Sequence, residues 1–183
     1  MDTKEKYESK DLEARDLHFS YWGAMNYFIG LIRSSELKAG LILSFYGIIF
    51  NFVYQNINSA KDEFSTFGIN HVIAILWLIS TMISMFHSVR TFIPRIEKKY
   101  EPNVFFFGDV ISKYGDIKEF SKTLLETSID KSKLYDQLGQ QIYINAKITA
   151  AKFKNVNTSL KYLLISLGLL LILVIEHILK TIF

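Results

Sequence analysis

The chain alternates long apolar stretches with strongly polar ones. Three long stretches, 37–57, 70–93 and 162–183, are predominantly apolar. Each has close to the ~20 residues that an α-helix needs to cross ~30 Å of hydrocarbon. The pattern therefore predicts three transmembrane helices, and the remaining polar residues must face water at a membrane surface.

The polar segments also have helical periodicity. Residues 10–36 place an apolar side chain at every third or fourth position, which is typical of one face of a helix. This face consists of Leu17, Tyr21, Met25, Phe28 and Ile32. We expect the helix to pack on the rest of the polar part and to run directly into the first span.

Helix boundaries are marked by proline and aspartate. Pro94 predicts the end of the second span, since proline disrupts the helical hydrogen-bond ladder. Asp116 and Glu119 form a capping box for a short helix, and Asp130 caps a last helix that runs from about Lys131 into the third span. The predicted packing stripe of this last helix is Leu134, Leu138, Ile142, Ala146, Thr149, Phe153, Val156 and Leu160.

The predicted fold is an all-α membrane protein with three transmembrane helices. Extensions of the first and third spans, with short helices after the second, form a cytosolic helical bundle. The predicted segments are a cytosolic helix 1–36, a span 37–57, an outer loop 58–69, a span 70–93, a cytosolic module 94–161 and a span 162–183.

Basic residues predict the orientation of the spans. Lysine and arginine are frequent before the first span and between the second and third, whereas the first connection contains only Lys61 and the C-terminal end only Lys180. Cytoplasmic loops carry the excess of basic residues in membrane proteins. We therefore expect a cytoplasmic N-terminus and an outer C-terminus.

Composition excludes several kinds of chemistry. Half of the residues are hydrophobic and 21% are charged, a mixture that fits spans joined to a polar module. The absence of cysteine excludes disulfides, thiolate metal sites and cysteine nucleophiles. The histidines lack the spacing of metal ligands, and the sequence contains no known catalytic motif and no nucleoside-triphosphate-binding loop. We expect neither an enzyme nor a metal protein.

Small and polar residues recur on one face of the first two spans. They are Gly40, Ser44, Gly47, Asn51 and Tyr54 in the first span, and Trp77, Ser80, Ser84, His87 and Ser88 in the second. Small residues allow close helix packing, and polar ones need partners away from lipid. The pattern fits a helix–helix contact, or a face that lines water when several chains assemble.

Basic residues also cluster near the inner membrane edge. Lysines at this level commonly determine topology and contact lipid headgroups. The alternative is a pocket for an anion such as a phosphate, with polar side chains nearby for a base. Its candidate residues are Lys38, Arg95, Lys98, Lys99, Gln141, Tyr143, Asn145, Lys152 and Lys154.

Several short strings in a fixed order carry a family resemblance. They are Glu36-Leu37-Lys38-Ala39, Pro94-Arg95, Asn103 through Val110, Gln141-Ile142-Tyr143, Asn145-Ala146 and Ala151-Lys152-Phe153. With this order and span layout, the chain resembles the transmembrane effector family of the bacterial pyrimidine-cyclase antiphage system (Pycsar). The family usually has aspartate where this chain has Glu36.

The resemblance implies a function in the bacterial inner membrane, with the outer loop and the C-terminus in the periplasm. A cyclic nucleotide, cyclic UMP or cyclic CMP, made by an adjacent cyclase would activate the effector. The effector would then disrupt the membrane and cause abortive infection. The implied partners are membrane lipid, the nucleotide and further copies of the chain, with no nucleic acid polymer and no cofactor. The alternatives are an effector answering a cyclic oligonucleotide, a non-gated scaffold that recruits a cytosolic partner, and a constitutive pore.

Overall fold

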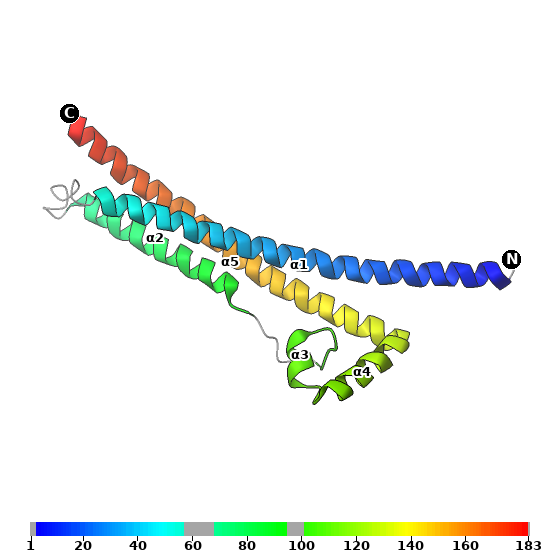
Figure 1. Cartoon of the computed structure of the whole chain (residues 1–183). Coiled ribbons are helices and arrows are strands. Elements are labelled where there is room, and N and C mark those ends of the chain that lie inside the picture. Colours follow the sequence, from blue (N-terminus) through cyan, green and yellow to red (C-terminus); the bar gives the residue numbers. More distant parts are fainter. Residues whose placement is uncertain (1–2, 57–67, 95–100, 183) are drawn as a thin grey trace. The chain divides into compact units, whose positions relative to one another are not determined.

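The structure is a computed structural model that describes residues 3–56, 68–94 and 101–182. These residues are almost entirely helical and contain no strand. The helices are α1 (Thr3–Asn56), α2 (Ile69–Phe92), α3 (Phe107–Ser112), α4 (Ile117–Ile129) and α5 (Lys131–Ile182) (Figure 1). Three of them, α1, α2 and α5, contain a stretch that is long and apolar enough to cross a membrane. The predicted all-α fold with three spans is confirmed.

Helix boundaries lie near Pro94 and at Asp116, the two residues that mark them in the sequence. Helix α2 ends two residues before Pro94, where Ile93 turns into an extended conformation. Helix α4 begins after Asp116, whose side chain accepts hydrogen bonds from the backbone amides of Lys118 and Glu119, both at 2.8 Å. These two amides have no carbonyl partner inside the helix, so the carboxylate stabilises the first turn.

The start of α5 and the turn before α4 are also set by single residues. The Asp130 carboxylate accepts hydrogen bonds from the amides of Ser132 at 3.0 Å and Lys133 at 3.2 Å, as predicted for a cap. Gly115 lies between α3 and α4 with a φ of +58°, a left-handed conformation that glycine adopts without steric cost. This conformation lets the chain reverse before α4.

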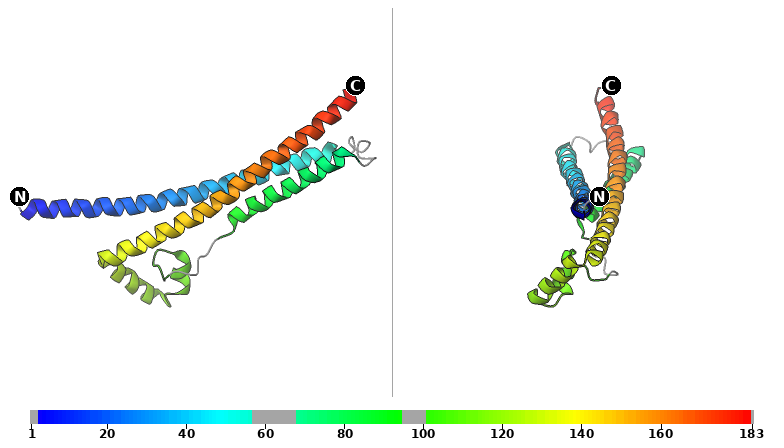
Figure 2. Two further views of the ribbon diagram at one scale, coloured as in Figure 1. Left: turned by 180° about the vertical axis from the view of Figure 1, so that it is seen from behind. Right: turned by 90° about the vertical axis from the view of Figure 1, so that its right-hand side faces the viewer.

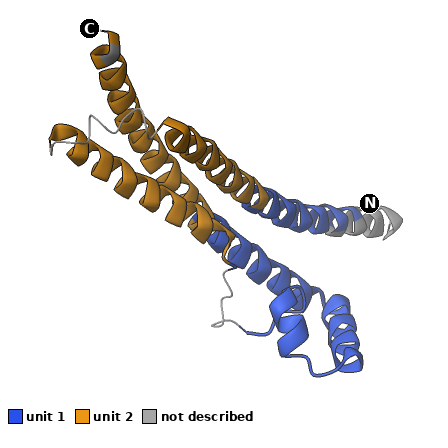
Figure 3. Cartoon of the chain, turned by 60° about the vertical axis from the view of Figure 1, so that its left-hand side comes forward, with its two compact units in different colours: residues 1–32, 94–150 blue, residues 33–93, 151–183 orange. Residues whose placement is uncertain are grey.

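The chain divides into two compact units (Figure 3). Unit 1 comprises Met1–Ile32 and Pro94–Ala150, and unit 2 comprises Arg33–Ile93 and Ala151–Phe183. Two of the three divisions fall inside continuous helices, one within α1 and one within α5, and the third follows the end of α2. Each unit therefore contains part of these two helices.

Unit 1 packs around the first half of α5. The predicted face of α1 takes part in this packing, because Met25 is buried and the ring of Tyr21 lies 5.2 Å from that of Tyr135 on α5. Leu17, at the end of the predicted stripe, is exposed. The buried apolar residues of unit 1 are Met25, Val104, Phe106, Tyr114, Leu138 and Ile144.

Unit 2 is a bundle of three helices with an apolar core cluster and an apolar outer surface. Helix α2 contacts the second half of α5, where Ser84 and Ser88 meet Ser159; Figures 1 and 2 show the two helices from three sides. The apolar core of unit 2 consists of Ile42, Tyr46, Ile49 and Leu163. Large apolar side chains also cover the outer surface, among them Leu41, Phe45, Ile48, Ile79, Met82, Phe86, Leu164 and Ile172. An outer surface of this kind suits hydrocarbon, where water is absent.

Candidate functional site

The contact between α2 and α5 in unit 2 is polar. Every fully buried residue of α2 has a polar side chain. The buried residues opposite them on α5 are mostly polar as well. We call this set the polar seam: Asn70, Ser80, Thr81, Ser84, Ser88 and Thr91 on α2, with Lys152, Asn155, Ser159 and Ser166 on α5.

Three serines form the centre of the polar seam. The Ser84 hydroxyl donates to the carbonyl oxygen of Ser159 at 2.8 Å, and the Ser159 hydroxyl donates to the carbonyl oxygen of Ser84, also at 2.8 Å. The Oγ atoms of Ser88 and Ser159 lie 2.6 Å apart. Because serine is small, it lets the two backbones approach closely enough for these reciprocal bonds.

Further polar contacts extend the seam along the bundle. The Nδ1 of His87 on α2 lies 3.3 Å from the Oδ1 of Asn155 on α5. On α1, the Tyr46 hydroxyl lies 3.1 Å from the Oγ of Ser166. The interior of unit 2 therefore carries hydrogen-bonding groups on all three helices.

An ion pair joins the same three helices. The Nζ of Lys152 on α5 lies 2.8 Å from the Oε1 of Glu36 on α1. It also donates to the carbonyl oxygen of Thr91, near the end of α2. Only 7% of the Lys152 side chain is exposed, against 37% for Glu36. Lys152 is thus a buried cation whose carboxylate partner remains in contact with the surroundings.

The other predicted lysines of unit 2 have different environments. The Nζ of Lys38 lies 5.8 Å from the centre of the Phe153 ring, within the range of a cation–π contact. Lys154 is exposed, because residues two apart on a helix point to nearly opposite sides. Arg95, Lys98 and Lys99 lie outside the described residues, so they stay predictions.

In unit 1 the structure brings two of the predicted polar residues together. Gln141 and Asn145 are both buried, and the Nε2 of Gln141 donates to the Oδ1 of Asn145 at 3.2 Å. The Oε1 of Gln141 is buried without a hydrogen-bond partner. One turn further along α5, the Thr149 hydroxyl contacts the carbonyl oxygen of Phe28 on α1 at 3.3 Å. Tyr143 lies on the exposed side of the helix.

The small and polar face predicted for the first span lies mostly outside the bundle. Ser44, Gly47 and Asn51 are exposed, and within the described residues no atom approaches the place of a Gly47 Cβ within 4 Å. Only Gly40 packs inward, where a Cβ would lie 3.7 Å from the Phe92 ring. Helix α1 packs instead through Ser35, Ala39, Ile42, Tyr46 and Ile49. In α2, by contrast, Ser80 and Ser84 are buried as a helix contact requires.

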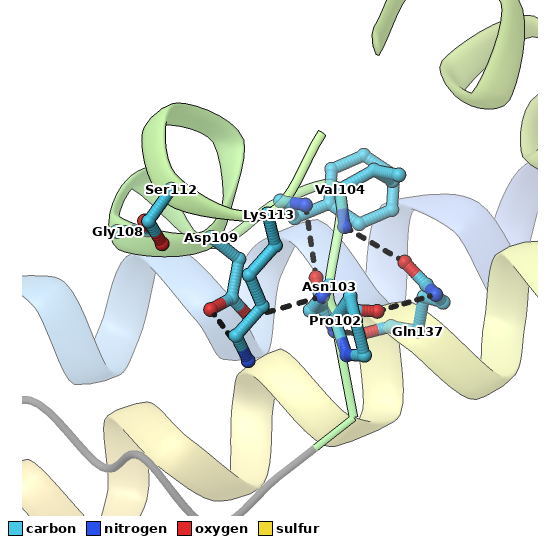
Figure 4. Close-up of polar contacts among 9 residues, drawn as sticks. Pro102, Asn103, Val104, Gly108, Asp109, Ser112, Lys113 and Gln137 are labelled. Atoms are coloured by element: carbon cyan, nitrogen blue, oxygen red, sulfur yellow. Dashed lines mark hydrogen bonds and ion pairs between the residues drawn. The ribbon is translucent and has the colours of Figure 1, made fainter. Parts of the chain in front are cut away.

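A hydrogen-bonded loop fixes the entry to α3 in unit 1 (Figure 4). Asn103 is fully buried, its Nδ2 donates to the carbonyl oxygen of Gln137 at 2.8 Å, and its Oδ1 accepts from the amide of Phe105 at 2.8 Å. The backbone amide of Asn103 in turn donates to the Asp109 carboxylate at 3.1 Å. Lys113 completes the network with an ion pair to Asp109 at 3.0 Å. These contacts position a loop; they present no open catalytic group.

Sequence reasoning missed the α5 side of the polar seam. Asn155, Ser159 and Ser166 were not predicted as site residues, although with Lys152 they recur at intervals of three, four and seven. That spacing places them on one helix face. Glu36 was noticed only as part of a motif, since its partner is 116 positions away in the chain. Among the described residues, no group of histidine and acidic side chains could hold a metal ion.

Three apolar helices with a polar interior define a membrane protein. The family model of the Pycsar effector protein domain matches residues 20–178, so the chain belongs to the Pycsar effector family. No curated protein and no solved structure matches the chain. Membership confirms the predicted resemblance and supports a role in antiphage defence. The Pycsar effector domain is a transmembrane effector domain and not a known catalytic family.

Proposed function

We propose that the protein is an inner-membrane effector that a cyclic nucleotide switches on and that then damages the membrane. Infection by phage would raise the nucleotide, made by an adjacent cyclase, and the damage would end the infection together with the host cell. Membership of the Pycsar effector family supports this proposal. The three apolar helices support the membrane as the place of action. Cyclic UMP and cyclic CMP are the proposed ligands.

The observation that carries the proposal is the Lys152–Glu36 ion pair. A cyclic nucleotide has one phosphate diester, with the same single negative charge as the Glu36 carboxylate. It can therefore replace Glu36 beside Lys152 without leaving the buried ammonium unpaired. Glu36 is already 37% exposed, so its carboxylate can move into water at little cost. This exchange would remove the ion pair between α1 and α5 and change the contact of Lys152 with the Thr91 carbonyl on α2.

The unbroken helices α1 and α5 support transmission of a conformational change from unit 1 to the membrane spans. Both α1 and α5 belong in part to unit 1 and in part to unit 2, without a break in either helix. A ligand shifts such a conformational balance only through its differential affinity for the two states. A difference of about 2–3 kcal/mol changes the ratio of the states roughly 30- to 150-fold.

Gln141 and Asn145, both in unit 1, remain candidate contacts for a base, as predicted from the sequence. Both are amides, which offer a donor and an acceptor to the edge of a base. The unpartnered Oε1 of Gln141 supplies an acceptor that the folded chain itself leaves unused. Tyr143, Arg95, Lys98 and Lys99 remain further candidates. The proposed assembly is a homo-oligomer, for which the exposed face with Ser44, Gly47 and Asn51 is available.

Dye release from vesicles tests the proposal. The purified protein is inserted into vesicles of phosphatidylethanolamine and phosphatidylglycerol that contain a self-quenched dye. We expect release with cyclic UMP or cyclic CMP and none with cyclic AMP. The K152Q variant should lose the response to the nucleotide, whereas the K154Q variant, which alters an exposed lysine of the same helix, should keep it. Tight vesicles with every nucleotide, despite folded and inserted protein, would contradict the proposal.

A scaffold that recruits a cytosolic partner is the second candidate function. It is favoured by apolar side chains on α3 and α4, because Phe107, Ile111, Ile117 and Ile129 are each more than two thirds exposed. Apolar groups in this density on a polar unit are typical of a protein contact. This function predicts a stoichiometric partner in pull-down experiments and vesicles that stay tight. A cyclic oligonucleotide as the activating ligand is tested by adding cyclic dinucleotides in the same dye assay.

A further inference from the structure

The polar seam contains more polar groups than the resting bundle satisfies. Hydrocarbon provides no water for a buried polar group, so a seam of apolar side chains would hold α2 and α5 together without polar atoms to satisfy. Toward the Asn70 end of α2 the hydrogen bonding is incomplete. The Oδ1 of Asn70, the Nε1 of Trp77 and the Oγ1 of Thr81 are buried without a hydrogen-bond partner. Buried polar atoms without partners are uncommon in folded proteins.

The helices of unit 2 are joined in two different ways. Helix α1 meets α5 through the apolar core, which includes Ile42, Ile49 and Leu163, and through two polar contacts, Tyr46 with Ser166 and Glu36 with Lys152. Helix α2 meets α5 through serine hydroxyls. If water entered the apolar contact, its hydrophobic stabilisation would be lost. The serine hydroxyls, by contrast, can replace their mutual hydrogen bonds with hydrogen bonds to water. The contact between α2 and α5 is therefore the one that can open to water at the lower cost.

We propose that the polar seam lines a water-filled path through the membrane when the effector is active. In the resting chain α2 and α5 bury the seam against each other. In the active state they part, Ser84, Ser88 and Ser159 contact water, and the Oδ1 of Asn70 and the Oγ1 of Thr81 gain hydrogen-bond partners. The path would pass water and small hydrated ions. This inference rests on the proposed function and assigns the residues that carry the damage.

A reversible bond across the seam tests the inference directly. The chain has no cysteine, so the introduced thiols have no native thiol to react with. The Oγ atoms of Ser88 and Ser159 are 2.6 Å apart, and the S88C/S159C variant can therefore form a disulfide with a small shift of the helices. We expect the oxidised variant to release at least tenfold less dye with cyclic UMP or cyclic CMP than the same protein after dithiothreitol. The S88C and S159C single variants, treated with the same oxidant, should release dye as the wild type does.

Thiol labelling provides a second measurement that does not need the disulfide. A charged, membrane-impermeant thiol reagent reacts only where water reaches the sulfur. We expect it to modify the S84C variant in the presence of the activating nucleotide and to leave it unmodified without nucleotide. Met82 lies on the outer, apolar face of α2, so the M82C variant is the control and should stay unmodified in both conditions.

The outcomes separate this inference from the proposed function. Undiminished release by the disulfide-locked variant, or equal labelling of the S84C and M82C variants, overturns the inference. Release that needs no nucleotide but stops when the disulfide forms supports the inference and contradicts the proposed activation.

Discussion

The ammonium of Lys152 and the carboxylate of Glu36 lie 2.8 Å apart in unit 2, joining α5 to α1. The lysine is almost fully buried, whereas more than a third of the glutamate side chain is exposed. Removing one partner of a buried pair leaves an uncompensated charge, which costs more than the pair itself contributes. The two ions therefore have unequal roles, because only Lys152 lacks an alternative partner in water.

Replacing Glu36 by leucine should accordingly destabilise the protein. In the E36L variant the buried Lys152 ammonium keeps only the Thr91 carbonyl, and we expect a loss of about 3 kcal/mol, as for other broken buried pairs. The E36L/K152M double variant should regain most of this loss, because it leaves no unpaired charge. The measurement is thermal unfolding in detergent, followed by circular dichroism. The K154M variant is the control, and equal stability of E36L and the wild type would contradict the prediction.

The cap of α4 can be tested by itself. In the D116A variant the amides of Lys118 and Glu119 lose their acceptor. We expect a loss of about 1 kcal/mol, with faster hydrogen exchange of these two amides. The D116N variant keeps an acceptor oxygen at the same place and should behave like the wild type. Unchanged exchange in D116A would show that the cap does not hold the first turn.

Any change to the buried side-chain amide of Asn103 should lower the stability of the protein. In the N103D variant the donor to the Gln137 carbonyl is replaced by an oxygen, and a second carboxylate is placed near Asp109. We expect a loss of about 2–3 kcal/mol, the effect of leaving a buried acceptor unpaired beside a new charge. The control is N26D, which makes the same change at an exposed position of α1. Equal stabilities of the two variants would contradict the role of this loop.

Helix ends were predictable because they depend on neighbouring residues. Asp116, Asp130 and Pro94 act within three or four positions of themselves, so their effect can be recognised in the sequence alone. The same holds for the packing of Met25, which follows from the spacing of a single helix. Spans are equally local, since length and apolar composition suffice to predict them.

The packing faces of the spans depend on their partners and were harder to predict. In α1 the small residues Ser44 and Gly47 suggested the packing face, yet the bundle uses Ile42, Tyr46 and Ile49. In hydrocarbon both faces are acceptable outside, because apolar side chains suit lipid and small ones expose little polar surface. The choice is made by the shape and hydrogen bonding of α2 and α5.

The last helix shows the same limit. Its predicted stripe is correct at Leu138, Thr149 and Val156, which are buried, but Leu160 is exposed and Ser159 takes its place. A search for apolar residues misses a helix contact built from serine and asparagine. The ion pair of Lys152 was missed for a different reason, since pairing across 116 positions is a property of the folded chain.

Tyr114 provides a prediction for alkaline pH. Its burial and the negative charge of Asp109 raise the pKa of Tyr114 above the ordinary value of 10.0. The folded state thus holds the phenol proton more tightly than the unfolded state, so this contribution to stability is complete below about pH 10 and disappears as the pH rises through the folded-state pKa. The Y114F variant cannot ionise and keeps a ring against Phe120, whose centre lies 5.8 Å away. Above about pH 10 the melting temperature of the wild type should therefore fall more steeply than that of Y114F, while near neutral pH both should change in parallel. Lysine titration affects both proteins equally, and parallel curves at alkaline pH would contradict the prediction.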